Sequence, residues 1–200
     1  QTKKDYKVSS NHLWIEKFMK NTNYSIVDNE GSGDCFFAVI RDAYQHIGKK
    51  TTVEKLRALL SSEANEEIFK QYRMLYNGFN SQYEEMEDEM KKLKKSAQIL
   101  KSRSKNSISR DQNKDLLEEA NAVIERYKQM ATDKKEIKQL MEEFEYMKEI
   151  KTLDEFKDFI KTRHYWADTW AVSTLERLLN IKVIIMSESA YKNGDLDSVL

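Results

Sequence analysis

The sequence predicts an α+β protein that is mostly helical, with a small central sheet and a long helical hairpin inserted between two parts of a core. Helix is favoured because the 200 residues contain no proline, and no glycine occurs between Gly78 and Gly194, so the residues that most often interrupt helices are missing over a long span. A sheet is favoured by residues 181–186, which are apolar and largely β-branched, as is typical of a central strand.

The N-terminal elements come in the order helix, strand, helix, helix. Residues 11–20 have the spacing of a short amphipathic helix, and residues 23–28 alternate briefly, as in a strand. The apolar run Phe37, Ile40, Tyr44 and Ile47 repeats at helical spacing, and Gly48 follows where that helix would end. Thr51-Thr52-Val53-Glu54 has capping-box spacing and predicts the start of another helix.

The only cysteine of the chain, Cys35, lies between a glycine turn and the second of these helices. Gly31 and Gly33 allow positive φ angles and a close approach of the backbone to a ligand. Cys35 is therefore predicted in the first turn of a helix, where N–H groups and the positive end of the helix dipole stabilise a thiolate and can hold a developing oxyanion. A lone cysteine is more often a small buried apolar residue, so the turn is what favours a nucleophile.

Residues 66–150 are predicted to form two long antiparallel helices. Apolar residues of the first helix follow an unbroken 4-3 spacing typical of a coiled-coil seam, and the polar stretch 102–107 predicts a turn. The seam of the first helix is Tyr72, Tyr76, Phe79, Tyr83, Met86, Met90, Leu93, Ala97 and Leu100. A second seam is predicted at Leu117, Ala120, Ile124, Tyr127 and Ala131, and less regularly at Ile137, Met141, Phe144 and Met147. Such an arm is either a solvated spacer or an insertion that contacts a substrate or partner, or mediates self-association.

The C-terminal elements are two helices and the strand. Thr152-Leu153-Asp154-Glu155 has capping-box spacing, and a helix is predicted over residues 168–180, directly before the strand at 181–186. The expected organisation is therefore an N-terminal part of the core at 1–65, the helical hairpin insertion at 66–150, and a C-terminal part of the core at 151–200.

Composition excludes several classes of protein. The formal net charge is 0, so no overall basic excess favours nucleic acid or an anionic membrane as a partner. One cysteine excludes an internal disulfide and fits a reducing, intracellular, cytoplasmic location. No apolar stretch is long enough to span a membrane. We find no metal-ligand spacing and no phosphate-binding or nucleotide motif, so no metal and no cofactor is expected.

Two segments together resemble the ovarian tumour (OTU) family of cysteine proteases, which are mostly deubiquitinases. Gly33-Asp34-Cys35-Phe36-Phe37 looks like the nucleophile motif of that family. The segment from Tyr165-Trp166 to Ile184-Ile185 is similar to the helix and central strand that follow in it. The resemblance implies a papain-related core of a small sheet flanked by helices. The long arm and the composition rich in lysine, asparagine and glutamate are reminiscent of OTU domains encoded by large DNA viruses, which would place the protein in the host cytoplasm or the virion.

The resemblance implies a thiol protease of the ubiquitin conjugation pathway. Cys35 would attack the isopeptide carbonyl at the C-terminus of ubiquitin, polyubiquitin or a ubiquitin-like modifier, and form an acyl-enzyme. Backbone N–H groups at Gly33 and Asp34 would form the oxyanion hole, and Ser32, Tyr165 and Trp166 would bind substrate. The chain departs from the family at Ser32, where members often have an aspartate.

The family also uses a histidine as general base, and the three histidines here do not fit its position. His12 precedes the nucleophile, His46 follows it on the same helix, and His164 precedes the tyrosine–tryptophan pair. The expected base therefore lies beyond residue 200, with the C-terminal part of the core truncated in a piece of a longer protein. Two alternatives stay open: a catalytically impaired ubiquitin-binding pseudoenzyme, and a coiled-coil interaction protein in which the cysteine is incidental.

Overall fold

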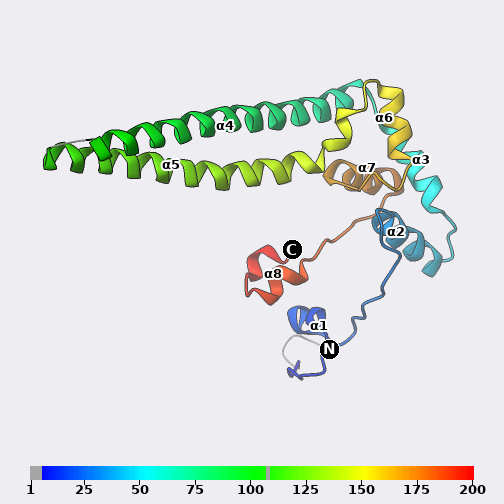
Figure 1. Cartoon of the computed structure of the whole chain (residues 1–200). Helices are drawn as coiled ribbons and strands as arrows, with labels where there is room; N and C mark the ends of the chain where they lie inside the picture. The colour runs from blue at the N-terminus through cyan, green and yellow to red at the C-terminus, as the bar shows by residue number, and fades with distance from the viewer. Residues whose placement is uncertain (1–5, 107–108) are drawn as a thin grey trace. The chain divides into compact units, whose positions relative to one another are not determined.

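The computed structural model describes residues 6–106 and 109–200, so Ser107 of the predicted turn and the first five residues lie outside the described part. Every regular element in that part is a helix (Figure 1). In chain order they are α1 (Trp14–Met19), α2 (Cys35–His46), α3 (Val53–Glu63), α4 (Glu66–Asn106), α5 (Arg110–Glu143), the 3-10 turn η1 (Glu145–Lys148), α6 (Leu153–Ile160), α7 (Thr169–Leu179), α8 (Glu188–Lys192) and the 3-10 turn η2 (Leu196–Ser198).

The predicted α+β fold with a central sheet is wrong. The described residues contain no strand, and both segments expected as strands, 23–28 and 181–186, are irregular. Ile184 and Ile185 are 71% and 67% exposed. The backbone N–H of Val183 donates to the Glu176 carboxylate at 2.7 Å, so a local side chain takes a donor that a strand partner would need. β-Branched residues favour a strand only where another strand pairs with them.

The chain divides into two compact units. The first comprises Gln1–Glu63 and Lys157–Leu200, and the second is Ala64–Phe156. In the first unit α3 packs against both α2 and α7. The core of these contacts is apolar and fully buried, with Phe37 and Ala38 from α2, Leu56 and Leu60 from α3, and Ala171 and Leu175 from α7.

The helix ends of the first unit follow the sequence signals closely. Thr52 caps α3, because its hydroxyl accepts a hydrogen bond from the N–H of Lys55. The Asp168 carboxylate accepts the N–H of Ala171 at the start of α7, and Asn180 ends that helix in the left-handed conformation. Gly48 follows α2 with a φ of 74°, as predicted.

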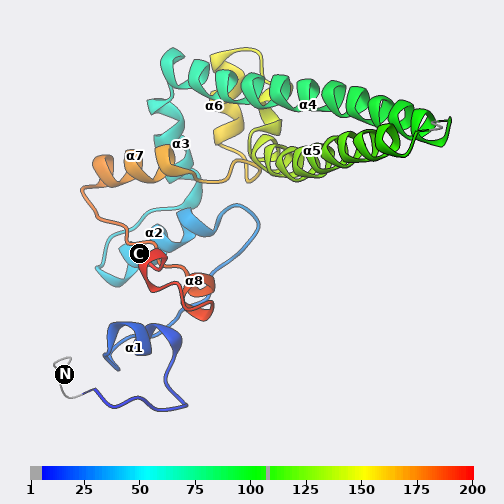
Figure 2. The same ribbon diagram turned by 90° about the vertical axis from the view of Figure 1, so that its left-hand side faces the viewer.

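The second unit confirms the predicted helical hairpin. Helices α4 and α5 lie side by side along their length in both views (Figures 1 and 2). All nine predicted seam residues of α4 are buried or half-buried. Helix α4 continues through the first part of the predicted turn, to Asn106. Aromatic rings meet at the base of the hairpin. The ring of Tyr72, on α4, contacts the rings of Phe144, at the end of α5, and Phe156, on α6, in tilted geometry.

The seam of α5 differs from the prediction by one residue over its first half. Leu116, Val123 and Met130 are half-buried, whereas the predicted Leu117 and Ile124 are exposed, as is Ala131. The true seam runs at regular 3-4 spacing and includes Lys134, whose side chain is only 21% exposed. The register was ambiguous from sequence because Leu116, Val123 and Met130 are each followed by a second apolar residue.

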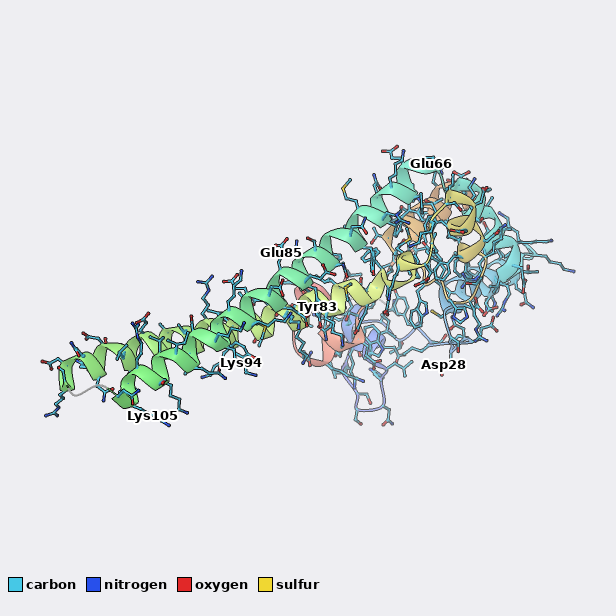
Figure 3. The ribbon with its side chains drawn as sticks, turned by 45° about the horizontal axis from the view of Figure 1, so that its top comes forward. Asp28, Glu66, Tyr83, Glu85, Lys94 and Lys105 are labelled. Atoms are coloured by element: carbon cyan, nitrogen blue, oxygen red, sulfur yellow. The ribbon has the colours of Figure 1, made fainter. Side chains whose placement is uncertain are left out.

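Lys134 is accommodated by two groups on α4. Its ammonium lies 2.6 Å from the Glu87 carboxylate and 4.4 Å from the centre of the Tyr83 ring. Figure 3 labels Tyr83 on α4 and shows Glu85 and Lys94 projecting away from that helix. The Glu87 carboxylate raises the pKa of Lys134, and the hydrogen bond from Lys134 lowers the pKa of Glu87.

Candidate functional site

Cys35 is the first residue of α2, and its side chain is exposed. The residues before it make a tight left-handed turn, with φ angles of 69° at Ser32 and 86° at Gly33. This placement confirms the prediction of a cysteine in the first turn of a helix after a positive-φ glycine. The roles predicted for Cys35, Gly33 and Asp34 in catalysis stay predictions.

Gly33 is buried against the loop that follows α6. A Cβ atom at this position would collide with the backbone carbonyl oxygen of Arg163, and it would lie 3.2 Å from the indole Nε1 of Trp166. The guanidinium of Arg163 in turn donates to the Ser32 carbonyl at 3.4 Å. The structure therefore brings the Cys35 turn together with the segment 163–166, whose last two residues, Tyr165 and Trp166, begin the second segment of the resemblance.

A buried arginine on α3 holds this junction together. Arg57 is 2% exposed. Its guanidinium donates to the carbonyl oxygens of Gly33 at 2.8 Å, Ile160 at 2.9 Å and Tyr165 at 3.2 Å. It also donates through Nε and Nη2 to one oxygen of Asp34, at 2.9 and 2.8 Å. A buried charge is tolerated only when it is paired and hydrogen-bonded, and Arg57 has both kinds of partner.

The Asp34 carboxylate is directed away from the helix that it precedes. Asp34 is the N-cap residue of α2, yet its side chain accepts no hydrogen bond from the first turn of that helix. An N-cap aspartate ordinarily accepts the N–H of the second or third helical residue. Here Arg57 takes the carboxylate, and the same guanidinium stacks 4.2 Å from the centre of the Phe37 ring.

The exposed side chains near the turn are partly apolar. Trp166 is 67% exposed, and Val39, one helical turn after Cys35 on the same face of α2, is 52% exposed. Tyr165 is 1% exposed, and its hydroxyl lies 3.4 Å from Asp168. Trp166 is thus available to a ligand of the Cys35 turn, whereas the Tyr165 side chain packs in the core and its backbone carbonyl meets Arg57.

The histidines differ in their placement. His12 is hydrogen-bonded to the Tyr6 hydroxyl at 2.8 Å. His46 is the last residue of α2, so it lies about 16 Å along the helix axis from Cys35 at a rise of ~1.5 Å per residue. His164 is exposed and stands between Arg163 and Trp166, the two residues that approach Gly33. Of the three histidines, His164 belongs to the segment that contacts the turn.

Sequence reasoning did not identify Arg57 or Arg163. Arg163 acts through its backbone carbonyl, which leaves no signal in the residue type. Arg57 has a weak signal, because it lies at helical spacing with Ser61 and Ala64, and all three are buried. A charged residue on the inner face of an amphipathic helix requires a partner, and the aspartate next to Cys35 was available for that role.

Other chemistries find no support in the described residues. Over 6–106 and 109–200, no group of three or more histidine, cysteine, aspartate or glutamate side chains is placed to hold a metal ion. None of the helices in these ranges combines the length and hydropathy needed to cross a membrane. Comparison with protein-family models, with curated protein sequences and with solved structures gave no match.

Proposed function

We propose that this chain is a cysteine-type deubiquitinase, which hydrolyses the bond at the C-terminus of ubiquitin or a ubiquitin-like modifier. The observation that carries the proposal is the exposed thiol of Cys35 at the first residue of α2, directly after the left-handed turn at Ser32 and Gly33. The proposal rests on this turn and its resemblance to the OTU nucleophile motif, and it requires no papain-like sheet.

The reaction uses the thiolate of Cys35. Its sulfur attacks the carbonyl carbon of the modifier's last residue, and the substrate oxygen takes the negative charge beside N–H groups of the turn and of α2. The bond from carbon to the lysine amine then breaks, and the amine leaves with the proton given up by the thiol. Water hydrolyses the resulting thioester, which releases the carboxylate and restores the thiol.

The surroundings of the turn suit a flexible peptide tail. Cys35 is exposed, and Trp166 and Val39 offer exposed apolar surface on the residues around it, against which a narrow peptide tail would pack.

The decisive experiment uses ubiquitin with a thiol-reactive group at its C-terminus. Because the chain has one cysteine, a single adduct seen by intact mass reports Cys35 alone. We expect one adduct on the wild-type protein and none on Cys35→Ala. If the wild-type protein reacts with iodoacetamide but forms no adduct with the ubiquitin probe or with probes of ubiquitin-like modifiers, the proposed substrate class is wrong.

The same probe tests the general base. We propose His164 as the described histidine best placed for this role, since it directly follows Arg163, whose backbone carbonyl packs against Gly33, and lies two residues before Trp166, whose indole also approaches Gly33. His164→Gln should slow cleavage of a ubiquitin C-terminal amide substrate, with His46→Gln as the matched control at the far end of α2. Equal rates for the two variants would mean that neither histidine is the base. Probe labelling without cleavage by the wild-type chain would favour the pseudoenzyme alternative.

A second candidate, an interaction protein built on the hairpin, is favoured by one surface of α4. Met74 and Leu75 are exposed there, and with Gly78 and Phe79 they line an open groove. If a binding partner is retained by Cys35→Ala and lost from the variant Met74→Ser/Leu75→Ser, this groove of α4 carries the binding; loss on replacing residues 80–148 by a short linker, with that variant still binding, would place the binding on the outer part of the hairpin.

A further inference from the structure

We propose that Arg57 is a positioning residue for Cys35, which acts by keeping the Asp34 carboxylate away from the first turn of α2. The inference rests on the proposed role of Cys35 as a nucleophile. The N–H groups at the start of α2 can stabilise a thiolate and an oxyanion. We infer that the side chain of Arg57, on α3, keeps these N–H groups free.

The first support is the set of atoms that Arg57 meets. The guanidinium donates to Asp34 and to the carbonyl oxygen of Gly33, the two residues directly before Cys35. It also donates to the carbonyl oxygens of Ile160 and Tyr165, on either side of the loop that packs on Gly33. The planar guanidinium therefore connects the turn before Cys35 to the loop that packs on Gly33. A lysine ammonium could not make this set of hydrogen bonds.

The second support is the conformation of Asp34. Its backbone occupies the N-cap position of α2, but its side chain makes no capping hydrogen bond. A carboxylate at this position has two competing partners, namely the N–H groups of α2 and a cation. Two N–H groups of the buried Arg57 donate to one oxygen of the half-buried Asp34 carboxylate, and such charge-assisted bonds compete well with a cap at an exposed helix end.

The consequence for Cys35 is electrostatic. The Asp34 backbone now has helical angles, with φ of −94° and ψ of −7°; without Arg57, residue 34 would relax to the extended angles of a capping residue, and its carboxylate would turn onto the N–H groups of α2 and bring a negative charge next to the sulfur. Those N–H groups would then be occupied, and the thiolate would be disfavoured by a like charge. Arg57 thereby keeps the start of α2 open for negative charge from the thiol or the substrate.

The test measures the rate at which iodoacetamide alkylates Cys35, read by intact mass over a range of pH. In this reaction the sulfur displaces iodide and forms the S–C bond, and the thiol proton passes to the buffer. We expect Arg57→Ala to slow alkylation at neutral pH by about threefold to tenfold, because the freed carboxylate occupies the N–H groups beside the sulfur. The double variant Arg57→Ala/Asp34→Ala should recover a rate within about twofold of wild type, because the competing carboxylate is gone.

A matched control separates positioning from mere stability. Leu60→Ala removes most of a fully buried apolar side chain from the same helix, one turn from Arg57, and leaves the polar groups of Arg57 and Asp34 unchanged. It should lower the unfolding midpoint and leave the alkylation rate unchanged well below that midpoint. A rate for Arg57→Ala equal to that of wild type, or a double variant no faster than the single one, would overturn the proposal.

Two further arrangements keep the result interpretable. If Arg57→Ala does not fold, Arg57→Lys takes its place. We expect this variant to be alkylated more slowly than wild type, by a smaller factor, and the addition of Asp34→Ala to restore the rate. An unchanged alkylation rate in Arg57→Lys would count against the proposal. Iodoacetamide requires no ubiquitin, so the outcome is independent of the substrate. A wild-type chain that never reacts with ubiquitin probes would refute the proposed function while the effect of Arg57 on the thiol would stand.

Discussion

The Cys35 turn and the α4–α5 hairpin are held together in opposite ways. At the turn, the buried guanidinium of Arg57 donates hydrogen bonds to acceptors from three separate segments of the chain. In the hairpin, α5 contains no buried residue, and its charged pairs are exposed or half-exposed, as between Lys134 and Glu87. The turn therefore depends on a few contacts that tolerate little change, whereas the hairpin depends on many weak contacts repeated along its length.

This difference is measurable because the two units carry different optical signals. All three tryptophans, Trp14, Trp166 and Trp170, belong to the first unit. The second unit holds the two longest helices, so it contributes much of the far-ultraviolet circular dichroism. Tryptophan fluorescence thus follows the unit with the turn, and circular dichroism weights the hairpin.

The largest effect is expected from Gly33→Ala. The added Cβ would meet the Arg163 carbonyl, a backbone atom that cannot rotate away, and the left-handed φ of 86° adds strain of about 1–2 kcal/mol. We expect a loss of about 3 kcal/mol or more in the free energy of unfolding, measured by tryptophan fluorescence in urea.

Gly48→Ala is the matched control for that variant. Gly48 has a similar φ of 74°, but nothing lies within 4 Å of the added Cβ. It should therefore lose only the strain of about 1 kcal/mol. Equal losses for the two variants would contradict the close packing of Gly33 against the loop.

A smaller effect is expected from Glu87→Gln in the hairpin. The substitution leaves the half-buried ammonium of Lys134 without its carboxylate, and because the pair is partly exposed the thermal midpoint should fall by only a few degrees. The loss should appear in thermal unfolding followed by circular dichroism and be absent from tryptophan fluorescence. Glu118→Gln, which breaks the exposed pair with Lys114, is the control and should change neither signal.

The same ion pair makes the hairpin sensitive to acid. The hydrogen bond from Lys134 lowers the pKa of Glu87 below its ordinary value of 4.5. The stabilisation is therefore fully present above about pH 4.5 and is lost as the pH falls through the lower, folded-state pKa. The circular dichroism midpoint should drop over that range in wild type and drop less in Glu87→Gln. A parallel drop in both proteins would assign the acid sensitivity to other carboxylates.

The two regions also differ in how well sequence reasoning predicted them. The hairpin was predicted because its contacts repeat every three or four residues, and the error of one residue in α5 arose at pairs of adjacent apolar residues, such as Val123 and Ile124, of which only one faces the seam. The turn was predicted as far as Gly33 and Cys35, which are neighbours in sequence. Arg57 was not, because its partners Ile160 and Tyr165 are about a hundred residues away.

The predicted sheet failed for a related reason. The apolar, β-branched segment 181–186 has the composition of a strand, but a strand forms only by pairing, and pairing partners are not visible in local composition. In the structure the Glu176 carboxylate satisfies the Val183 N–H, and no strand of the described residues lies beside the segment. Local patterns thus predicted elements stabilised locally, and failed for those that need a distant partner.

The smallest effect on stability is expected from Trp166→Ala. The side chain is 67% exposed, so its removal should change the free energy of unfolding by no more than about 0.5 kcal/mol, measured by the fluorescence of the remaining Trp14 and Trp170, which belong to the same unit. If the exposed indole contacts the substrate tail, labelling by the ubiquitin probe should slow severalfold while alkylation by iodoacetamide stays the same. Equal slowing of both reactions would instead mean that Trp166 supports the turn through its contact with Gly33. The tryptophan would then stabilise the Cys35 turn and would not bind substrate.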